Sequence, residues 1–207
     1  MGEPTGKAAP GTVRPGGRTS RVGIAVLEAT LQVLAERGYT GLTVERVAEC
    51  SGVNKSTIYR RWQTKESLLA AAVDNMADEL FPISKTGVID EDLRSFGRSL
   101  VDALTSESPS VAGVMRALLS DAGGEPRIAE IKRDFFAKRY REAAAMVDIA
   151  IADGHLPSDT DVRNLVGLVA APLYYRKLVT SEPLDHTVAD AAVETALIAL
   201  QAGACRT

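Results

Sequence analysis

Cationic and hydrogen-bonding side chains gather in one short run of the sequence, at residues 54–60. On a helix, with about 100° between successive residues, Ile58 and Trp62 would face inward together because they lie four residues apart. The side chains left on the opposite face and its flank are Lys55, Ser56, Thr57, Tyr59 and Arg60. Their hydroxyl, ammonium and guanidinium groups can bind base edges and phosphates, so such a helix suits the major groove of DNA.

The residues just before this run predict the elements that position it. Val44, Val47 and Ala48 recur at helical spacing and give a short helix with one apolar face. Gly52 can adopt the positive φ of a tight turn, and Asn54 can cap the following helix by accepting from a backbone N–H. The pattern therefore predicts helix, turn and helix. An ordinary helical hairpin with a solvated polar face has the same pattern, so these residues alone leave both interpretations open.

Residues 24–73 resemble the N-terminal domain of the TetR family of bacterial transcriptional regulators. Trp62 stands where the family more often has Phe, and Ser51 where it often has Ala, but both keep a packing role. The segments that match in residue type and spacing are Glu36-Arg37-Gly38-Tyr39, Leu42-Thr43-Val44, Val47-Ala48, Ser51-Gly52-Val53, Ser56-Thr57-Ile58-Tyr59 and Lys65-Glu66-Ser67-Leu68.

The resemblance implies a symmetric dimer on a near-palindromic operator in double-stranded DNA. Each recognition helix, at residues 54–62, would enter a major groove, the two lying roughly 34–36 Å apart. The residues expected at base edges are Lys55, Ser56, Thr57 and Arg60, and those expected at phosphates are Thr43, Tyr59 and Lys65. Asn54 and Arg21 complete the expected DNA-binding set.

Residues 1–19 predict a disordered basic arm, because they hold five Gly, three Pro and few apolar side chains. Arg14, Arg18 and Arg21 either reach the DNA, as the basic arms of other helix-turn-helix proteins do, or belong to a plain tail. The sequence leaves both possibilities open.

The composition is that of a soluble, folded protein. The 207 residues are 45% hydrophobic and 25% charged, which allows one large or two small domains with a core. Residues 1–67 carry 10 Lys and Arg against 6 Asp and Glu, whereas the remaining residues carry 14 against 21. A basic N-terminal part on an acidic remainder fits a protein that presents one end to phosphate.

The His and Cys residues argue against a metal site by their spacing. Cys50 and Cys205 form no CxxC pair, and His155 and His186 stand alone. We expect no metal, no cofactor, and free thiols in a cytoplasmic protein. The first twenty residues lack the apolar segment of a signal peptide, and no apolar run is long enough for a membrane span.

Apolar periodicity predicts an all-α fold of about nine helices, without a sheet. We expect a three-helix helix-turn-helix domain with its connecting helix at residues 20–81 and a larger helical ligand-binding and dimerisation domain at residues 82–207. Pro172 should kink or interrupt the eighth helix. The expected helices cover about residues 20–37, 44–50, 54–62, 65–80, 90–105, 109–120, 126–153, 160–180 and 186–202.

By the same resemblance, an effector pocket would lie among the helices of residues 82–207. An apolar pocket with few charges suits a hydrophobic or amphipathic small molecule. Aromatic residues at helical spacing also make plain cores, so this assignment stays open. The candidate lining residues are Met115, Leu118, Phe135, Phe136, Tyr140 and Tyr174.

The last two expected helices are apolar on more than one face, and such helices are buried on more than one face. The resemblance implies a four-helix dimer interface, the alternative being that they complete the core of a monomer. The candidate interface residues are Val169, Leu173, Val188, Ala192, Thr195 and Ala199.

Together these features predict a ligand-responsive, DNA-binding repressor that binds a palindromic operator as a homodimer and is released by a small hydrophobic effector. A non-specific architectural DNA-binding protein is one alternative. An all-helical enzyme or a small-molecule carrier is another, but no nucleophile elbow, P-loop or dinucleotide fingerprint is present.

Overall fold

A computed structural model describes residues 17–119 and 126–206, with side chains described for residues 20–115 and 126–206. Within these residues the chain is all-α, as predicted, and its extended pairing is limited to one bridge between Thr160 and Arg206. The elements are α1 (Gly17–Gly41), α2 (Val44–Ser51), α3 (Lys55–Trp62), α4 (Lys65–Leu80), α5 (Ile89–Leu104), α6 (Pro109–Leu119), α7 (Pro126–Ala152), α8 (Val162–Tyr175), the π-helix η1 (Arg176–Thr180) and α9 (His186–Gln201).

The helices α1 to α4 form the head of the molecule. Capping side chains precede three of them, α2, α3 and α4. Thr43 accepts a hydrogen bond from the backbone N–H of Arg46, Asn54 from that of Ser56, and Thr64 from that of Ser67. Gly38, with a positive φ of 65°, interrupts the regular helical turns of α1. Gly52, with a φ of 68°, ends α2. Local chemistry therefore sets where α2, α3 and α4 begin and where α2 ends.

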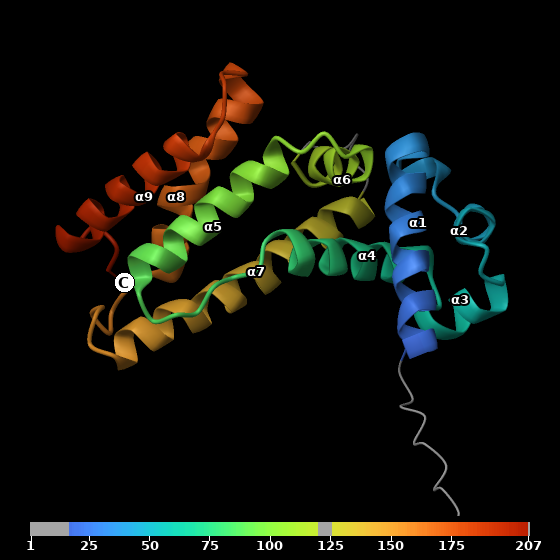
Figure 1. Ribbon diagram of the computed structural model, residues 1–207, viewed down its shortest axis with the longest axis horizontal. Coiled ribbons are helices and arrows are strands. Elements are labelled where there is room, and N and C mark those ends of the chain that lie inside the picture. Colours follow the sequence, from blue (N-terminus) through green and yellow to red (C-terminus); the bar gives the residue numbers. More distant parts are fainter. Residues whose placement is uncertain (1–16, 120–125, 207) are drawn as a thin grey trace, which may run out of the picture.

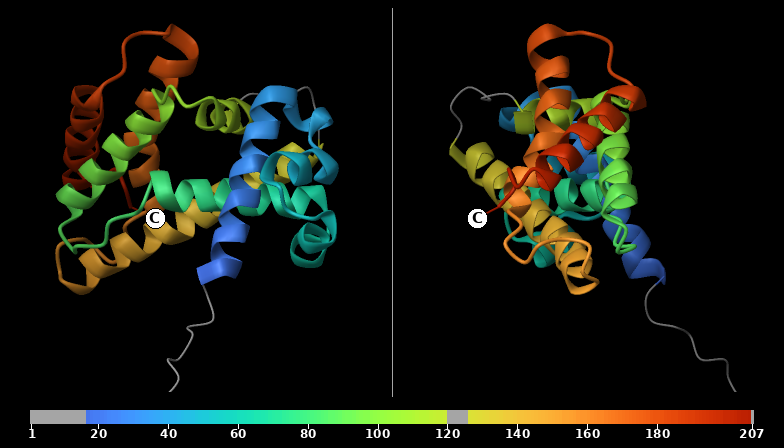
Figure 2. Two further views of the ribbon diagram at one scale, coloured as in Figure 1. Left: turned by 45° about the vertical axis from the view of Figure 1, so that its right-hand side comes forward. Right: turned by 90° about the vertical axis from the view of Figure 1, so that its left-hand side faces the viewer.

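The helices α5 to α9 form the body. The head packs on the body through α1 and α4, which contact α6 and α7. α2 and α3 lie beyond α1 at one end of the molecule, and α8 and α9 lie at the other (Figure 1). Between them α4 packs along α7, and α1 packs on α6, in views that agree (Figures 1 and 2). At its start α1 begins at Gly17, three residues before the predicted position.

One apolar core runs through both parts of the chain. It extends from Val26 and Ile58 in the head to Phe135 and Leu173 in the body. A second core lies wholly in the body and contains Leu93. Although α4 ends at Leu80 and α5 begins at Ile89, where the sequence predicts a domain boundary, the buried apolar side chains continue across it.

The eighth helix carries Pro172 without ending there. α8 continues for three residues to Tyr175 and then widens into the π-helix Arg176–Thr180, so the predicted single helix is divided beyond the proline. In the described part of the chain, no helix combines the length and apolar character that crossing a membrane requires.

Candidate functional site

α3 presents the polar face that the sequence predicts. Ile58 is 1% exposed and anchors the helix to the core, with Trp62 partly buried beside it. Lys55, Ser56, Tyr59 and Arg60 are exposed, and Thr57 is partly exposed. Tyr59 is 45% exposed, so its ring and hydroxyl can be reached by an external partner.

Contacts within the head already orient several of these side chains. The Asn54 side chain accepts from both the backbone N–H and the hydroxyl of Ser56, each at 2.9 Å. Lys55 Nζ lies 3.8 Å from Glu45 in an exposed pair, which is a weak contact that a phosphate can replace. Asn54 therefore acts first as a cap, while Lys55 stays available.

Arg61 differs from its neighbour Arg60. Its guanidinium lies 4.8 Å from the centre of the Trp62 ring and against α1 at Gly23, where the missing side chain makes room for it. Both arginines are exposed, but Arg61 contacts α1 and the Trp62 ring and so helps to hold the recognition helix against α1.

Two of the three expected phosphate contacts lie at helix starts. Thr43 and Lys65 stand at the beginnings of α2 and α4, where backbone N–H groups favour anions. Lys65 Nζ lies 4.1 Å from the centre of the Tyr39 ring, and the Tyr39 hydroxyl donates to Glu66 at 2.8 Å. Burial opposes ionisation of Glu66, but this hydrogen bond, a backbone N–H at the start of α4, the nearby Lys65 and Thr64 together leave its pKa lowered.

The predicted basic arm falls almost wholly outside the described residues. Arg14 lies outside them, and Arg18 lies in α1 without a described side chain. Arg21 is exposed near the start of α1.

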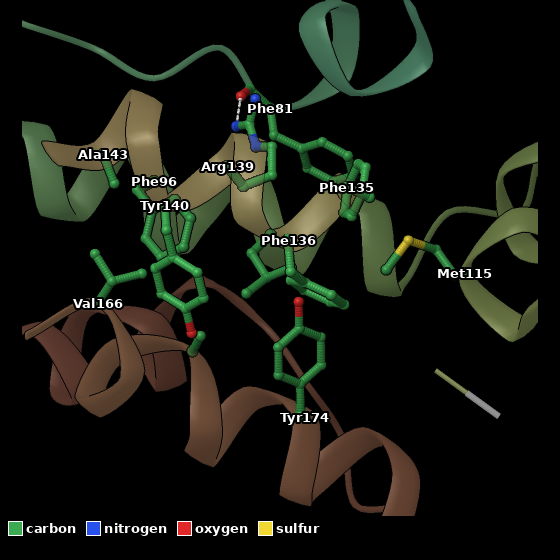
Figure 3. A pocket seen from close by; sticks show the side chains of 12 residues that line it. Phe81, Phe96, Met115, Phe135, Phe136, Arg139, Tyr140, Ala143, Val166 and Tyr174 are labelled. Atoms are coloured by element: carbon green, nitrogen blue, oxygen red, sulfur yellow. Dashed lines mark hydrogen bonds between the residues drawn. The ribbon is translucent and has the colours of Figure 1, made fainter. Parts of the chain in front are cut away.

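A pocket opens between α4, α5, α6, α7 and α8, and five of the six predicted lining residues surround it (Figure 3). The space between its atoms is about 690 Å³, including the mouth that is open to solvent. Leu118 lies outside the residues whose side chains are described. The predicted lining residues that the structure brings together are Met115, Phe135, Phe136, Tyr140 and Tyr174.

Sequence reasoning missed the side of the pocket that touches the head. Arg139 of α7 donates to the carbonyl of Phe81, the residue directly after α4, and to Glu142 at 2.7 Å. The Arg139–Glu142 pair has helical spacing and is visible in the sequence, but Phe81 lies 58 positions away. The other lining residues that were not predicted are Phe96, Leu100, Ala143, Val166 and Ala170.

The burial pattern corrects three of the expected dimer contacts. Val169 and Leu173 are 0% exposed and Ala192 is 6% exposed, because α8 and α9 pack on α5 within the protomer. Their side chains complete the core of this chain and are closed to a second one. Val188 and Ala199 are partly exposed, and Thr195 is exposed.

Large apolar side chains nevertheless remain exposed at this end of the body. Tyr175 is 59% exposed, Leu178 51%, and both Val179 and Ile198 67%. They lie at the end of α8, on η1 and on α9. The outer sides of α8 with η1 and of α9 therefore both carry exposed apolar groups, which an interaction surface would cover.

Comparison with known proteins covers both parts of the chain. Residues 26–72 match the family described as bacterial regulatory proteins, tetR family, and residues 83–196 match the tetracyclin repressor-like C-terminal domain. The chain belongs to the TetR family. It is a ligand-responsive transcriptional regulator, and regulators of this family bind DNA and small-molecule effectors, form dimers and are typically repressors.

Relatives within the TetR family match nearly the whole chain. The HTH-type transcriptional regulator YdeS of Bacillus subtilis is 27% identical over 179 residues, which are 86% of this chain and 89% of that protein. The DNA-binding transcriptional repressor TetR of Mycobacteroides abscessus is 27% identical over 191 residues, covering 85% of this chain and 92% of that one. The crystal structure of the TetR family transcription regulator SCO0332 superposes with a TM-score of 0.68 at 29% identity, covering 86% and 97% of the two chains.

Proposed function

We propose that the protein is a repressor that binds a near-palindromic operator as a homodimer and that a small hydrophobic molecule in the pocket releases it. The observation that carries the proposal is the exposed face of α3, where donors and cations stand opposite the buried anchor Ile58. The proposed base contacts are Lys55, Ser56, Thr57 and Arg60, and the proposed phosphate contacts are Arg21, Thr43, Tyr59 and Lys65.

The homodimer is proposed to form through the exposed sides of α8, η1 and α9. Thr195, Ile198 and Ala199 lie on α9, and Ile198 offers the largest exposed apolar group of the three. A two-fold axis would bring the same surface of both copies together. Ile198→Glu should then yield a monomer in analytical ultracentrifugation, while Ile24→Glu, a comparable change on α1, should leave the dimer intact.

The release step is proposed to act through the contacts between α4 and α7. The Phe81 ring lines the pocket, and its carbonyl accepts from Arg139. One residue earlier on α7, Lys138 forms ion pairs with Asp74 at 3.6 Å and Asp78 at 3.2 Å, both on α4. A ligand that displaces Phe81 would shift the end of the helix that carries the head, with a coupling of about 1–3 kcal/mol.

The first experiment is fluorescence anisotropy with a duplex from the region flanking the protein's own gene and a scrambled duplex, at several salt concentrations. The proposal expects much tighter binding to the native duplex, surviving moderate salt. Equal binding to both duplexes, falling steeply with salt, would instead favour a protein that grips phosphate without reading sequence, or an operator elsewhere. Absence of DNA binding at low salt would overturn the proposal.

A further inference from the structure

Aromatic side chains are concentrated around the pocket. All four phenylalanines of the chain line it, together with two of its five tyrosines, although aromatic residues make up only 5% of the sequence. Phe135 and Phe136 meet edge to face, with ring centres 5.3 Å apart and an interplanar angle of 79°. Aromatic rings prefer edge-to-face or offset contacts with one another, so these walls favour an aromatic occupant over a flexible aliphatic one.

The electrostatics of the pocket favour a neutral occupant. Arg139 is the one charged side chain among the described lining residues, and Glu142 lies 2.7 Å from its guanidinium and compensates the charge. A ligand carboxylate would lose its hydration without meeting an uncompensated cation. A ligand cation would meet no carboxylate among the described lining residues.

One polar group in the walls is left without a partner. The hydroxyl of Tyr174 points toward Phe136 inside the pocket (Figure 3), and no described residue forms a hydrogen bond with it. Burial raises the pKa of Tyr174 to about 12, so the hydroxyl keeps its proton at neutral pH. It is therefore a donor that faces an apolar space and lacks an acceptor.

The second hydroxyl of the walls, on Tyr140, has a different setting. The Arg163 guanidinium lies 4.6 Å from the centre of the Tyr140 ring and holds that ring from the α8 side. In Figure 3 the Tyr140 hydroxyl is directed toward α8, while that of Tyr174 is directed across the pocket. Tyr174 is thus the better placed donor for a ligand.

We propose that the pocket selects a neutral aromatic ligand that carries a hydrogen-bond acceptor oxygen of the ketone type, and that the Tyr174 hydroxyl donates to this oxygen. The inference deepens the proposed function, since it rests on the pocket being the effector site. Burying a ligand carbonyl without a hydrogen-bond donor weakens binding, whereas a donor placed to meet it makes the carbonyl's contribution to the binding free energy favourable. The preference for a ketone over the corresponding hydrocarbon should therefore depend on the Tyr174 hydroxyl.

Three probes with one two-ring skeleton test the proposal on the full chain by isothermal titration calorimetry: tetralin, 1-tetralone and tetralin-1-carboxylate. We expect 1-tetralone to bind about fivefold tighter than tetralin, the worth of one neutral hydrogen bond. The carboxylate should bind at least about tenfold more weakly than the ketone, because the pocket leaves its charge unpaired.

Tyr174→Phe removes the donor and keeps the ring. In this variant the affinity for tetralin should stay unchanged, and that for 1-tetralone should fall to or below it. The matched control is Tyr175→Phe, the same change at the next position, where the side chain is 59% exposed and outside the pocket, so the ketone preference should persist. Loss of the preference in Tyr140→Phe but not in Tyr174→Phe would overturn the assignment, as would tighter binding of the carboxylate.

The same protein samples separate this inference from the proposed function. If the ketone preference depends on Tyr174 but no duplex is bound with specificity, the pocket chemistry stands and the regulatory proposal fails. If an operator is bound but wild-type protein and Tyr174→Phe treat tetralin and 1-tetralone alike, the regulatory proposal stands and the inference is wrong.

Discussion

The DNA-binding face and the pocket are built in opposite ways. The proposed base contacts lie on one eight-residue helix, whose start is set by the Asn54 cap and whose inner side is held by Ile58. The pocket instead takes its walls from five helical regions between residues 81 and 174. A surface made from one element keeps its geometry as long as that element is held in place. A cavity made from many elements changes when any of them moves, which is the property that a ligand-controlled switch needs.

The largest effect should come from the anchor of the recognition helix. Ile58→Ala removes a side chain that is 1% exposed, so we expect a loss of about 3 kcal/mol in the free energy of unfolding. Because one core spans head and body, the variant should still unfold in a single transition, with its midpoint at a lower urea concentration. Trp62, the one tryptophan of the chain, reports on the head, and far-UV circular dichroism reports on all helices during urea unfolding.

Ile24→Ala is the matched control, since that side chain is 38% exposed and its removal should cost much less. If the Trp62 signal of Ile58→Ala is lost at lower urea than the helical signal, the head unfolds alone. The continuous core would then fail to couple the two regions, and the contrast drawn above would be between independent domains.

The second prediction concerns the contact between α1 and α6. A Cβ added at Gly113 would lie 2.8 Å from the Cβ of Ala35 and 2.9 Å from its Cα, so Gly113→Ala should push the two helices apart. We expect a net destabilisation of about 1–2 kcal/mol, the overpacking cost less the gain in helix propensity.

Gly167→Ala is the same change in α8, where an added Cβ meets nothing within 4 Å of the protomer. Here the propensity gain should dominate and raise stability by about 0.5–1 kcal/mol in thermal unfolding. Equal effects of the two substitutions would contradict close packing between head and body at Gly113.

The comparison also explains what could be predicted from the sequence. The helix-turn-helix was predictable because its signals are local: Thr43, Asn54 and Thr64 cap the helices, and Gly52 takes the left-handed conformation at the turn. Each of these depends on backbone chemistry within a few residues, so one stretch of sequence contains the whole explanation.

The rest depends on contacts between distant residues. Four of the aromatic residues that line the pocket, Phe135, Phe136, Tyr140 and Tyr174, were predicted from the sequence, but Phe81 and Phe96 were not. The link from Arg139 to Phe81 was not predictable, because it joins α7 to the end of α4. Val169, Leu173 and Ala192 were misassigned for a related reason. An apolar helix face predicts burial, but it does not tell whether a helix of the same chain or of a second copy covers that face.

A third, smaller effect separates base contacts from phosphate contacts within the head. Arg60→Ala should reduce discrimination at one operator position by about 1–3 kcal/mol. Lys65→Ala should weaken binding to all sequences alike and lower the slope of log K against log salt by about one. Arg141→Ala, which removes the same charge from an exposed position on α7, should change neither quantity in anisotropy titrations. A change in salt slope without a change in specificity for Arg60→Ala would move Arg60 to the phosphate set.

The smallest effect is expected from an ion pair that joins two helices of the body. Asp190 of α9 accepts from Arg98 of α5 at 2.9 and 2.7 Å, and this hydrogen bonding is the main reason why the pKa of Asp190 lies below its usual value of 3.8. A carboxyl whose pKa is lower in the folded state stabilises the fold above its unfolded-state pKa, and this contribution disappears as pH falls through the lower, folded-state value. The melting temperature of Asp190→Asn should therefore lie slightly below that of the wild type near neutral pH, and the two should converge in acid.

Asp148→Asn, an exposed position on α7 without an ion pair among the described residues, should show no such convergence. A difference that persists unchanged in acid would mean that Asp190 holds α9 to α5 through packing and not through its charge, which would make the two ends of the molecule more alike than the ion pairs indicate.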